Sequence, residues 1–162
     1  MILLAIDPGP EKSAWLDYDT DAKQVVAAGI QENDMVLNLC DRAPKHCHYL
    51  AIEMIASYGM AVGASTFETC VWIGRFIQAF GMCDYDLAYR KDIKLHLCGS
   101  LRAKDANVRQ ALIDRFPATG GGKTPQIGTK KQPGPLHGIK SHLWSALAVA
   151  VYWADTHEEN EL

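Results

Sequence analysis

The opening of the chain constrains the fold more than any other segment. Residues 1–6 are all apolar, and Asp7 follows them directly, just before Pro8 and Gly9. An apolar run without a polar face is typical of a central strand covered on both sides. Proline cannot donate to a strand ladder and glycine permits a tight turn, so the strand should end there. Asp7 is then either a ligand for a metal or a phosphate-linked cation, or a turn former that accepts backbone N–H bonds.

Length and composition favour one domain. The chain has 162 residues, enough to bury about two-thirds of its unfolded surface. We expect a single domain over residues 1–157 and a disordered acidic tail over residues 158–162. No apolar run is long enough to span a membrane, and the first residues do not resemble a secretory leader. Five cysteines, an odd number without a CxxC pair, favour a reducing compartment, so we expect a cytoplasmic protein.

One cysteine cluster raises the question of zinc. His46, Cys47 and His48 follow Cys40 by six to eight residues. The predicted strand begins at His48, and adjacent residues on a strand point to opposite faces. The sequence therefore gives no expectation of a zinc site there.

Charge is segregated along the chain. Residues 1–89 carry 5 Lys/Arg against 12 Asp/Glu, residues 90–141 carry 11 against 3, and residues 142–162 carry 0 against 4. A basic segment of this kind is typical of a surface that meets a polyanion such as nucleic acid. The alternative is a solvated surface whose basic residues fold back onto the acidic half.

Periodicity and turn residues predict the order of elements. We expect strands over 1–6, 13–18, 23–30, 48–55 and 85–89, and helices over 32–42, 91–98, 104–116 and 140–156. A further long helix should run from Ser65 or Thr66 to Phe80, opened by a capping box over 65–68. Segment 117–138 is rich in glycine and proline, which predicts that it resists packing and forms a mobile or partner-ordered loop.

This order predicts an α/β protein with a ribonuclease H-like fold. An antiparallel hairpin continued by strand–helix crossovers gives a five-stranded mixed sheet flanked by helices, with the long C-terminal helix over the active site. Strand–helix alternation alone would also allow a flavodoxin-like fold. The carboxylates favour the first, because there Asp7 and Glu53 emerge from adjacent strands at one edge. Oxygen ligands of this kind suit Mg²⁺, and His142 and Ser145, one helical turn apart, should approach the same edge.

Three segments together resemble the signature blocks of RuvC-type Holliday-junction resolvases, closest to a compact phage or prophage-type branch. They are residues 2–13 (ILLAIDPGPEKS), 50–53 (LAIE) and 142–150 (HLWSALAVA). Residues 94–112 (KLHLCGSLRAKDANVRQAL) resemble the basic turn-and-helix segment of that family. The resemblance implies a crossover junction endonuclease that depends on Mg²⁺ or Mn²⁺, two ions per active site. It also implies a homodimer that nicks branched DNA on two strands by phosphodiester hydrolysis, in recombination and repair.

The resemblance assigns roles to four residues. Asp7 is the ligand shared by both metals, Glu53 is the second carboxylate, and His142 falls where the family has Asp or His. Ser145 falls where the family has Asp, and a neutral hydroxyl binds Mg²⁺ poorly. Two alternatives remain open: a sparser but active site, or a protein on the same fold that binds junctions and cuts them poorly or not at all.

DNA contacts are expected from three places. The basic turn and helix offer phosphate contacts. The glycine-rich loop, residues 117–138, and the residues just after it offer lysines. An aromatic residue after Glu53 could stack on an unpaired base. These residues are Arg102, Lys104, Arg109, Lys123, Lys130, Lys131, Lys140 and Tyr58. The alternative role for Tyr58 is packing against neighbouring side chains.

A third class of function rests on weak signals. Asp7-Pro8-Gly9 also occurs in phosphotransferases of the actin–kinase superfold, and residues 120–124 (GGGKT) hint at a phosphate loop. The pattern fails, because Pro117 stands where its first glycine is required and a helix rather than a strand precedes it. The chain is also too short for the duplicated kinase fold.

Overall fold

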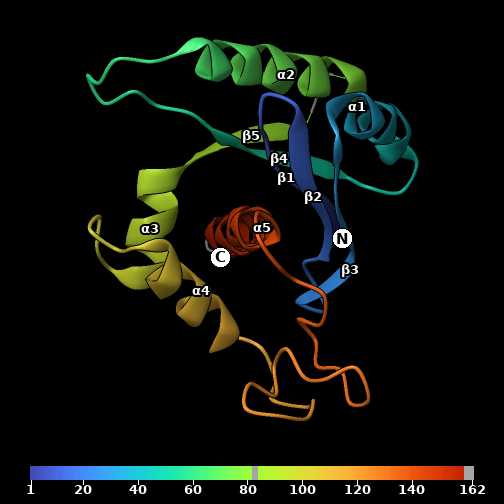
Figure 1. Cartoon of the computed structure of the whole chain (residues 1–162). Helices are drawn as coiled ribbons and strands as arrows, with labels where there is room; N and C mark the ends of the chain where they lie inside the picture. The colour runs from blue at the N-terminus through green and yellow to red at the C-terminus, as the bar shows by residue number, and fades with distance from the viewer. Residues whose placement is uncertain (82–83, 159–162) are drawn as a thin grey trace.

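A five-stranded mixed sheet forms the centre of the computed structural model, which describes residues 1–81 and 84–158 (Figure 1). The strand order is β3-β2-β1-β4-β5. Strands β1 to β3 form an antiparallel meander, and β4 and β5 continue from β1 in parallel. The strands are β1 (Ile2–Asp7), β2 (Lys12–Asp19), β3 (Gln24–Glu32), β4 (Tyr49–Met54) and β5 (Tyr85–Tyr89).

Helices cover both faces of this sheet. Helices α1 and α2 lie on one face, and α5 lies on the other, flanked by α3 and α4 (Figure 1). The helices are α1 (Asn33–Arg42), the short 3₁₀ helix η1 (Ala43–Lys45), α2 (Ala64–Phe80), α3 (Arg90–Cys98), α4 (Asp105–Ile113) and α5 (Leu143–Glu158). No helix in the described part of the chain is long and apolar enough to cross a membrane.

Strand β1 is apolar on both faces because both faces are buried. Leu3 and Ala5 pack in the core beneath α5, while Leu4 and Ile6 pack in the second core beneath α1 and α2. All four side chains are fully buried. The continuous apolar run of the sequence therefore predicted the central strand correctly.

The fold confirms the ribonuclease H-like expectation. The β1–β4 pair is parallel and the β1–β2 pair is antiparallel, which separates this sheet from an all-parallel flavodoxin-like one. Helix α5 is buried nearly all round, as a helix laid across a sheet should be, and its first turn stands at the β1–β4 edge.

Several predicted boundaries were wrong: the helix expected over 104–116 ends at Ile113, and the helix expected from residue 140 begins at Leu143. Helix α2 begins at Ala64 with Gly63 as its N-cap, and no side chain caps it, so Ser65 does not open a capping box. Helix α5 extends through Glu158, whose carboxylate pairs with Lys23 in the β2–β3 turn, so residue 158 is not part of a disordered tail. The rest of the proposed tail, residues 159–162, lies outside the described residues.

The expectation that segment 117–138 resists packing was also wrong. Backbone hydrogen bonds close the loop on itself, among them Gly121 N–H to Gln132 O and Gly134 N–H to Ile127 O. Leu136 is fully buried in the core beneath α5. A Cβ atom on Gly134 would lie 2.2 Å from the carbonyl oxygen of Pro125. Glycine is required at such a position because one backbone segment packs directly against another. A glycine-rich composition alone does not distinguish a tightly packed loop of this kind from a disordered one.

Candidate active site

Asp7 and Glu53 lie at adjacent strand ends. Ile6 of β1 pairs with Ile52 of β4, and each strand's next residue is the acid. Because the two strands are parallel, both carboxylates emerge at the same edge of the sheet. Their side chains are 13 % and 14 % exposed, so the site holds two carboxylates largely removed from water.

The electrostatics of this pair favour a bound cation. Burial, together with the charge of Asp7, raises the pKa of Glu53 to about 7 against the opposing effect of Arg90. Burial also raises the pKa of Asp7, although His142 opposes the shift. A divalent ion would remove this cost, because it stabilises both ionised forms at once. The donor set, all oxygen and imidazole, fits Mg²⁺ or Mn²⁺.

The residue just before α5 and the first turn of α5 contribute the next two side chains. Nδ1 of His142 lies 3.0 Å from Oδ2 of Asp7, and the imidazole is 73 % exposed. Ser145, one turn further on, lines the same cleft. All four residues predicted as catalytic therefore meet at one place. With Nδ1 directed at Asp7, Nε2 of His142 remains as its second ring nitrogen for a ligand.

Sequence reasoning missed two charged residues of the site. Arg90 places Nη1 3.7 Å from Oε1 of Glu53, and its Nη2 donates to Asp105 at the start of α4. The available signal was register: Arg90 follows Tyr89, the β5 residue paired with Met54, so it emerges beside the end of β4. The position of Arg90 beside Glu53 follows from the sequence only if β5 is placed next to β4.

These residues line a cleft of about 640 Å³. Its walls come from the strand ends, from the N-terminal parts of α3 and α4, and from the first turn of α5. The cleft is lined by Asp7, Glu53, Arg90, Asp105, Ala106, Val108, Arg109, Ser141, His142, Trp144 and Ser145. The guanidinium carbon of Arg109 lies 4.8 Å from the centre of the Trp144 ring, which holds this cation at the rim. Arg109 is thus the one predicted DNA contact among the cleft-lining residues.

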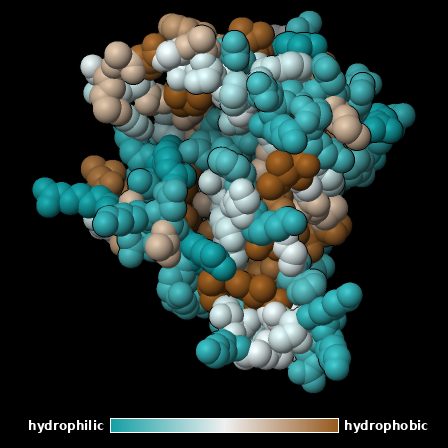
Figure 2. Space-filling model, viewed as in Figure 1, coloured by the Kyte–Doolittle hydropathy of each residue, from teal (hydrophilic) through white to brown (hydrophobic). Residues whose placement is uncertain are grey.

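The other predicted DNA contacts are exposed but do not line the cleft. Arg102 and Lys104 lie in the turn before α4, and Tyr58 is 58 % exposed in the loop between β4 and α2. The remaining contacts, exposed in or next to the glycine-rich loop, are Lys123, Lys130, Lys131 and Lys140. Figure 2 shows hydrophilic side chains projecting from the pale surface at the lower end of the molecule, where this loop lies.

The segment 120–124 does not form a phosphate loop. It lies within the closed loop between α4 and α5, whereas a phosphate loop connects a strand to a helix. Within the described residues there is one sheet and no duplicated domain. These observations leave the phosphotransferase alternative without structural support.

Comparison with solved structures identifies the fold. No protein-family model matches the chain, and no curated protein matches it by sequence. The structure resembles that of RuvC from Thermus thermophilus, with a TM-score of 0.65 and 18 % identity over 97 % of each chain. It also resembles T. thermophilus RuvC in complex with a Holliday junction substrate, with a TM-score of 0.71 and 15 % identity over 99 % of this chain and 96 % of the other. This chain therefore has the ribonuclease H-like fold of RuvC.

Proposed function

We propose that this protein is a RuvC-type endonuclease that resolves Holliday junctions or other branched DNA by divalent-metal-dependent phosphodiester hydrolysis. The observation that carries the proposal is the pair of largely buried carboxylates, Asp7 and Glu53, at adjacent strand ends beside His142. Their position on a fold shared with a protein solved on a Holliday junction substrate supports the choice of DNA.

In this proposal Asp7, Glu53 and His142 hold two Mg²⁺ or Mn²⁺ ions. When bound, such ions activate a water molecule and stabilise charge on the attacking and leaving oxygens of a phosphodiester. Asp7 would be the ligand shared by both ions, as the RuvC resemblance implies, and His142, whose Nδ1 lies 3.0 Å from Oδ2 of Asp7, would orient its carboxylate. Arg90 neutralises part of the charge on Glu53 and stands in the cleft where a phosphate would enter. Ser145 supplies a hydroxyl where a third carboxylate would bind more strongly.

We place the DNA on the face that carries the cleft mouth and the basic segment. Arg109 at the rim, with Arg102 and Lys104 before α4, would contact phosphates nearest the cut. Lys123, Lys130, Lys131 and Lys140 would contact an arm further out. Tyr58 would stack on an unpaired base, and its exposure makes it available for that role.

The active form should be a homodimer. A four-way junction is resolved by two symmetric nicks, and the described part of each chain holds one such carboxylate pair. Two copies are therefore needed for paired cuts. Apolar side chains exposed on and before α2 offer a surface for the second copy: Met60, Val62, Phe67 and Val71. The cysteines at 40, 47, 70 and 98 are free thiols, which suits the proposed cytoplasmic location.

One experiment tests the activity. Purified protein is incubated with an end-labelled four-way junction or linear duplex of matched arms, in Mg²⁺, Mn²⁺ or EDTA. We expect paired nicks in the junction only, in either metal. Asp7→Asn should lower the rate by about 10³-fold, since metal catalysis contributes several kcal/mol, and should leave junction binding intact. The matched control Asp34→Asn, an exposed acid on α1, should cut normally.

The second candidate is a junction-binding protein that does not cut, and Ser145 is the residue that favours it. An EDTA-insensitive mobility shift without nicks in either metal would support this candidate and contradict the nuclease. Unchanged nicking by Asp7→Asn would contradict the assignment of the active site.

A further inference from the structure

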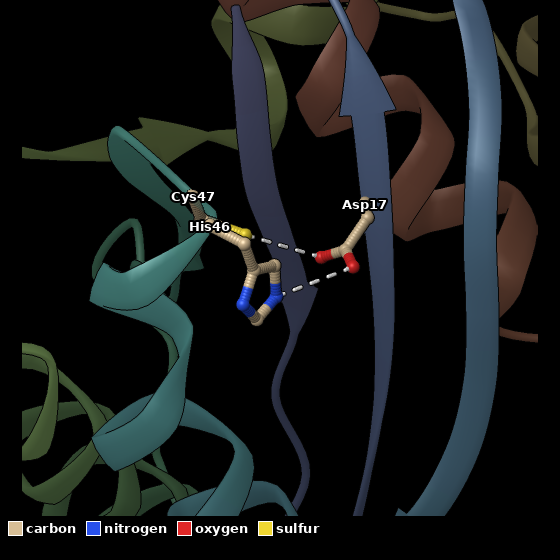
Figure 3. A group of neighbouring side chains, drawn as sticks. All are labelled: Asp17, His46 and Cys47. Atoms are coloured by element: carbon tan, nitrogen blue, oxygen red, sulfur yellow. Dashed lines mark hydrogen bonds and ion pairs between the residues drawn. The ribbon is translucent and has the colours of Figure 1, made fainter.

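A second cluster of ligand-type side chains lies on the sheet face opposite the active site. Asp17 of β2 is paired with Leu4 of β1 and, like Leu4, belongs to the face covered by α1 and α2. Asp7 points to the other face, toward α5. His46 and Cys47 lie between η1 and β4, and both side chains point at the Asp17 carboxylate (Figure 3). Strand β4 begins at Tyr49, so His46 and Cys47 precede it and the alternation of side chains along a strand does not separate them.

The distances suit a tetrahedral metal site. Sγ of Cys47 lies 3.5 Å from Oδ1 of Asp17, and Nε2 of His46 lies 3.8 Å from Oδ2. One ligand atom from each residue lies within 4.8 Å of the other two. Zinc bonds of ordinary length place neighbouring ligand atoms of a tetrahedral site about 3.3–3.6 Å apart. His46 is 54 % exposed, so its imidazole has room to move closer and water can reach a fourth position.

The charge of the Asp17 carboxylate also favours a bound cation. Asp17 is 8 % exposed, and within the described residues the S–H of Cys47 donates the only hydrogen bond to its carboxylate. A thiol is a weak donor, and no lysine or arginine of residues 1–81 and 84–158 pairs with this acid. A buried carboxylate usually has a strong donor or a positive partner, because taking its charge out of water is costly.

We propose that Asp17, His46 and Cys47 bind one Zn²⁺ ion, with water as the fourth ligand. On binding, the Cys47 thiol loses its proton to solvent and the thiolate, carboxylate and neutral imidazole coordinate the ion. The ion would join β2 to the segment that leads into β4. It would therefore hold together two elements that are 30 residues apart in the chain.

This site differs from the active site in chemistry as well as position. A thiolate selects Zn²⁺ or Co²⁺ over the hard ion Mg²⁺, whereas Asp7 and Glu53 offer oxygen. The inference does not rest on the proposed nuclease activity, and a failure of either leaves the other standing.

Cobalt is the probe that separates the two sites. Full-length protein is stripped with a chelator, dialysed and titrated with Co²⁺ alone. We expect a near-ultraviolet thiolate-to-cobalt absorption band that saturates at about one equivalent and disappears when Zn²⁺ is added. Excess Mg²⁺ should leave the band unchanged. A wild-type titration without this band would overturn the proposal.

Variants assign the band to the cluster. Cys47→Ser should abolish it, and His46→Ala should weaken Co²⁺ binding at least about tenfold, as loss of a ligand does. The matched control Cys70→Ser, a half-buried thiol on α2, should keep the band, as should Asp7→Asn in the active site. A band that survives in Cys47→Ser would contradict the assignment.

A stability measurement covers the case in which Cys47→Ser folds poorly. His46 is exposed, so His46→Ala should fold normally, and circular dichroism checks this. Zn²⁺ should raise the Tm of the wild-type protein by several degrees and that of His46→Ala by much less. Equal shifts in the two proteins would rule out His46 as a ligand.

Discussion

Nη1 of Arg90 lies 3.7 Å from Oε1 of Glu53, but Glu53 is not the only acid that Arg90 pairs with. The same guanidinium also binds Asp105, whose carboxylate is 86 % exposed at the start of α4. Arg90 is thus divided between two acids, and Asp7 adds a further negative charge beside Glu53. Burial, and after it the charge of Asp7, therefore holds the pKa of Glu53 near 7 despite its cationic neighbour.

This pKa predicts how stability depends on pH in the absence of metal. The folded state holds the proton on Glu53 up to about pH 7, whereas the unfolded chain releases it near 4.5. Between these values the folded state binds more protons, so the free energy of unfolding falls as pH rises. The contribution of Glu53 is on the order of 3 kcal/mol. Urea unfolding in EDTA at pH 5 and pH 7.5 measures it.

Glu53→Gln should remove this part of the pH dependence, because the amide does not titrate. The control Glu68→Gln, on exposed helix surface, should keep the wild-type slope. Saturating Mg²⁺ should restore stability to the wild-type protein at pH 7.5 and have little effect on Glu53→Gln. A wild-type profile as flat as that of Glu53→Gln would mean that Glu53 titrates normally.

Salt dependence tests the lysines of the glycine-rich loop. Lys130 and Lys131 are exposed at its tip, and each phosphate contact they make releases counterions. Replacing both with alanine should lower the slope of log K against log [salt] for junction binding by up to about 2. The double variant of Lys23 and Lys45 removes equal charge outside the basic segment and should keep the slope. An unchanged slope in the loop variant would exclude phosphate contact there.

Ser145→Asp tests the position where the site departs from the RuvC pattern. Ser145 lines the cleft with His142, Asp7 and Glu53, so a carboxylate there would face the same ions. We expect the midpoint of a Mg²⁺ titration to move to lower concentration, both for nicking rate and for the Mg²⁺-induced rise in Tm. The reason is that a third carboxylate adds a negative charge that offsets the charge of the cation, whereas a neutral hydroxyl does not. No shift in either titration would mean that position 145 does not contact the metals.

Gly134→Ala tests the packing of the glycine-rich loop. The added Cβ would lie 2.2 Å from the oxygen of Pro125 and 2.4 Å from that of Gln126, and backbone cannot yield cheaply. We expect a loss of about 1–3 kcal/mol in the free energy of unfolding, measured with urea. Gly74→Ala is the matched control. Apart from the backbone of its own helix, no atom of the described residues lies within 4 Å of the added Cβ, and alanine favours helix, so the change should stabilise α2 by up to about 1 kcal/mol. Equal stability of the two variants would contradict tight packing of the loop.

Local pattern was enough to predict the sheet and its acidic edge. The apolar run of β1 is buried on both faces, and Asp7 ends it where proline and glycine require a turn. Strand type and order follow from side-chain periodicity and turn residues, which act over a few residues and are visible in one sequence. The meeting of Asp7 with Glu53 followed once β1 and β4 were placed side by side.

Tertiary structure alone decided which distant groups meet. Arg90 reaches Glu53 only because β5 pairs with β4, and Asp17 meets His46 and Cys47 only because β2 packs beneath the segment after η1. The glycine-rich loop has a composition typical of disorder, yet its glycines let one backbone segment pack directly on another. Such contacts join residues far apart in the chain, and their energies depend on packing geometry. The sequence therefore determined the strands, the helices and the acidic edge, and only the folded chain determined what surrounds them.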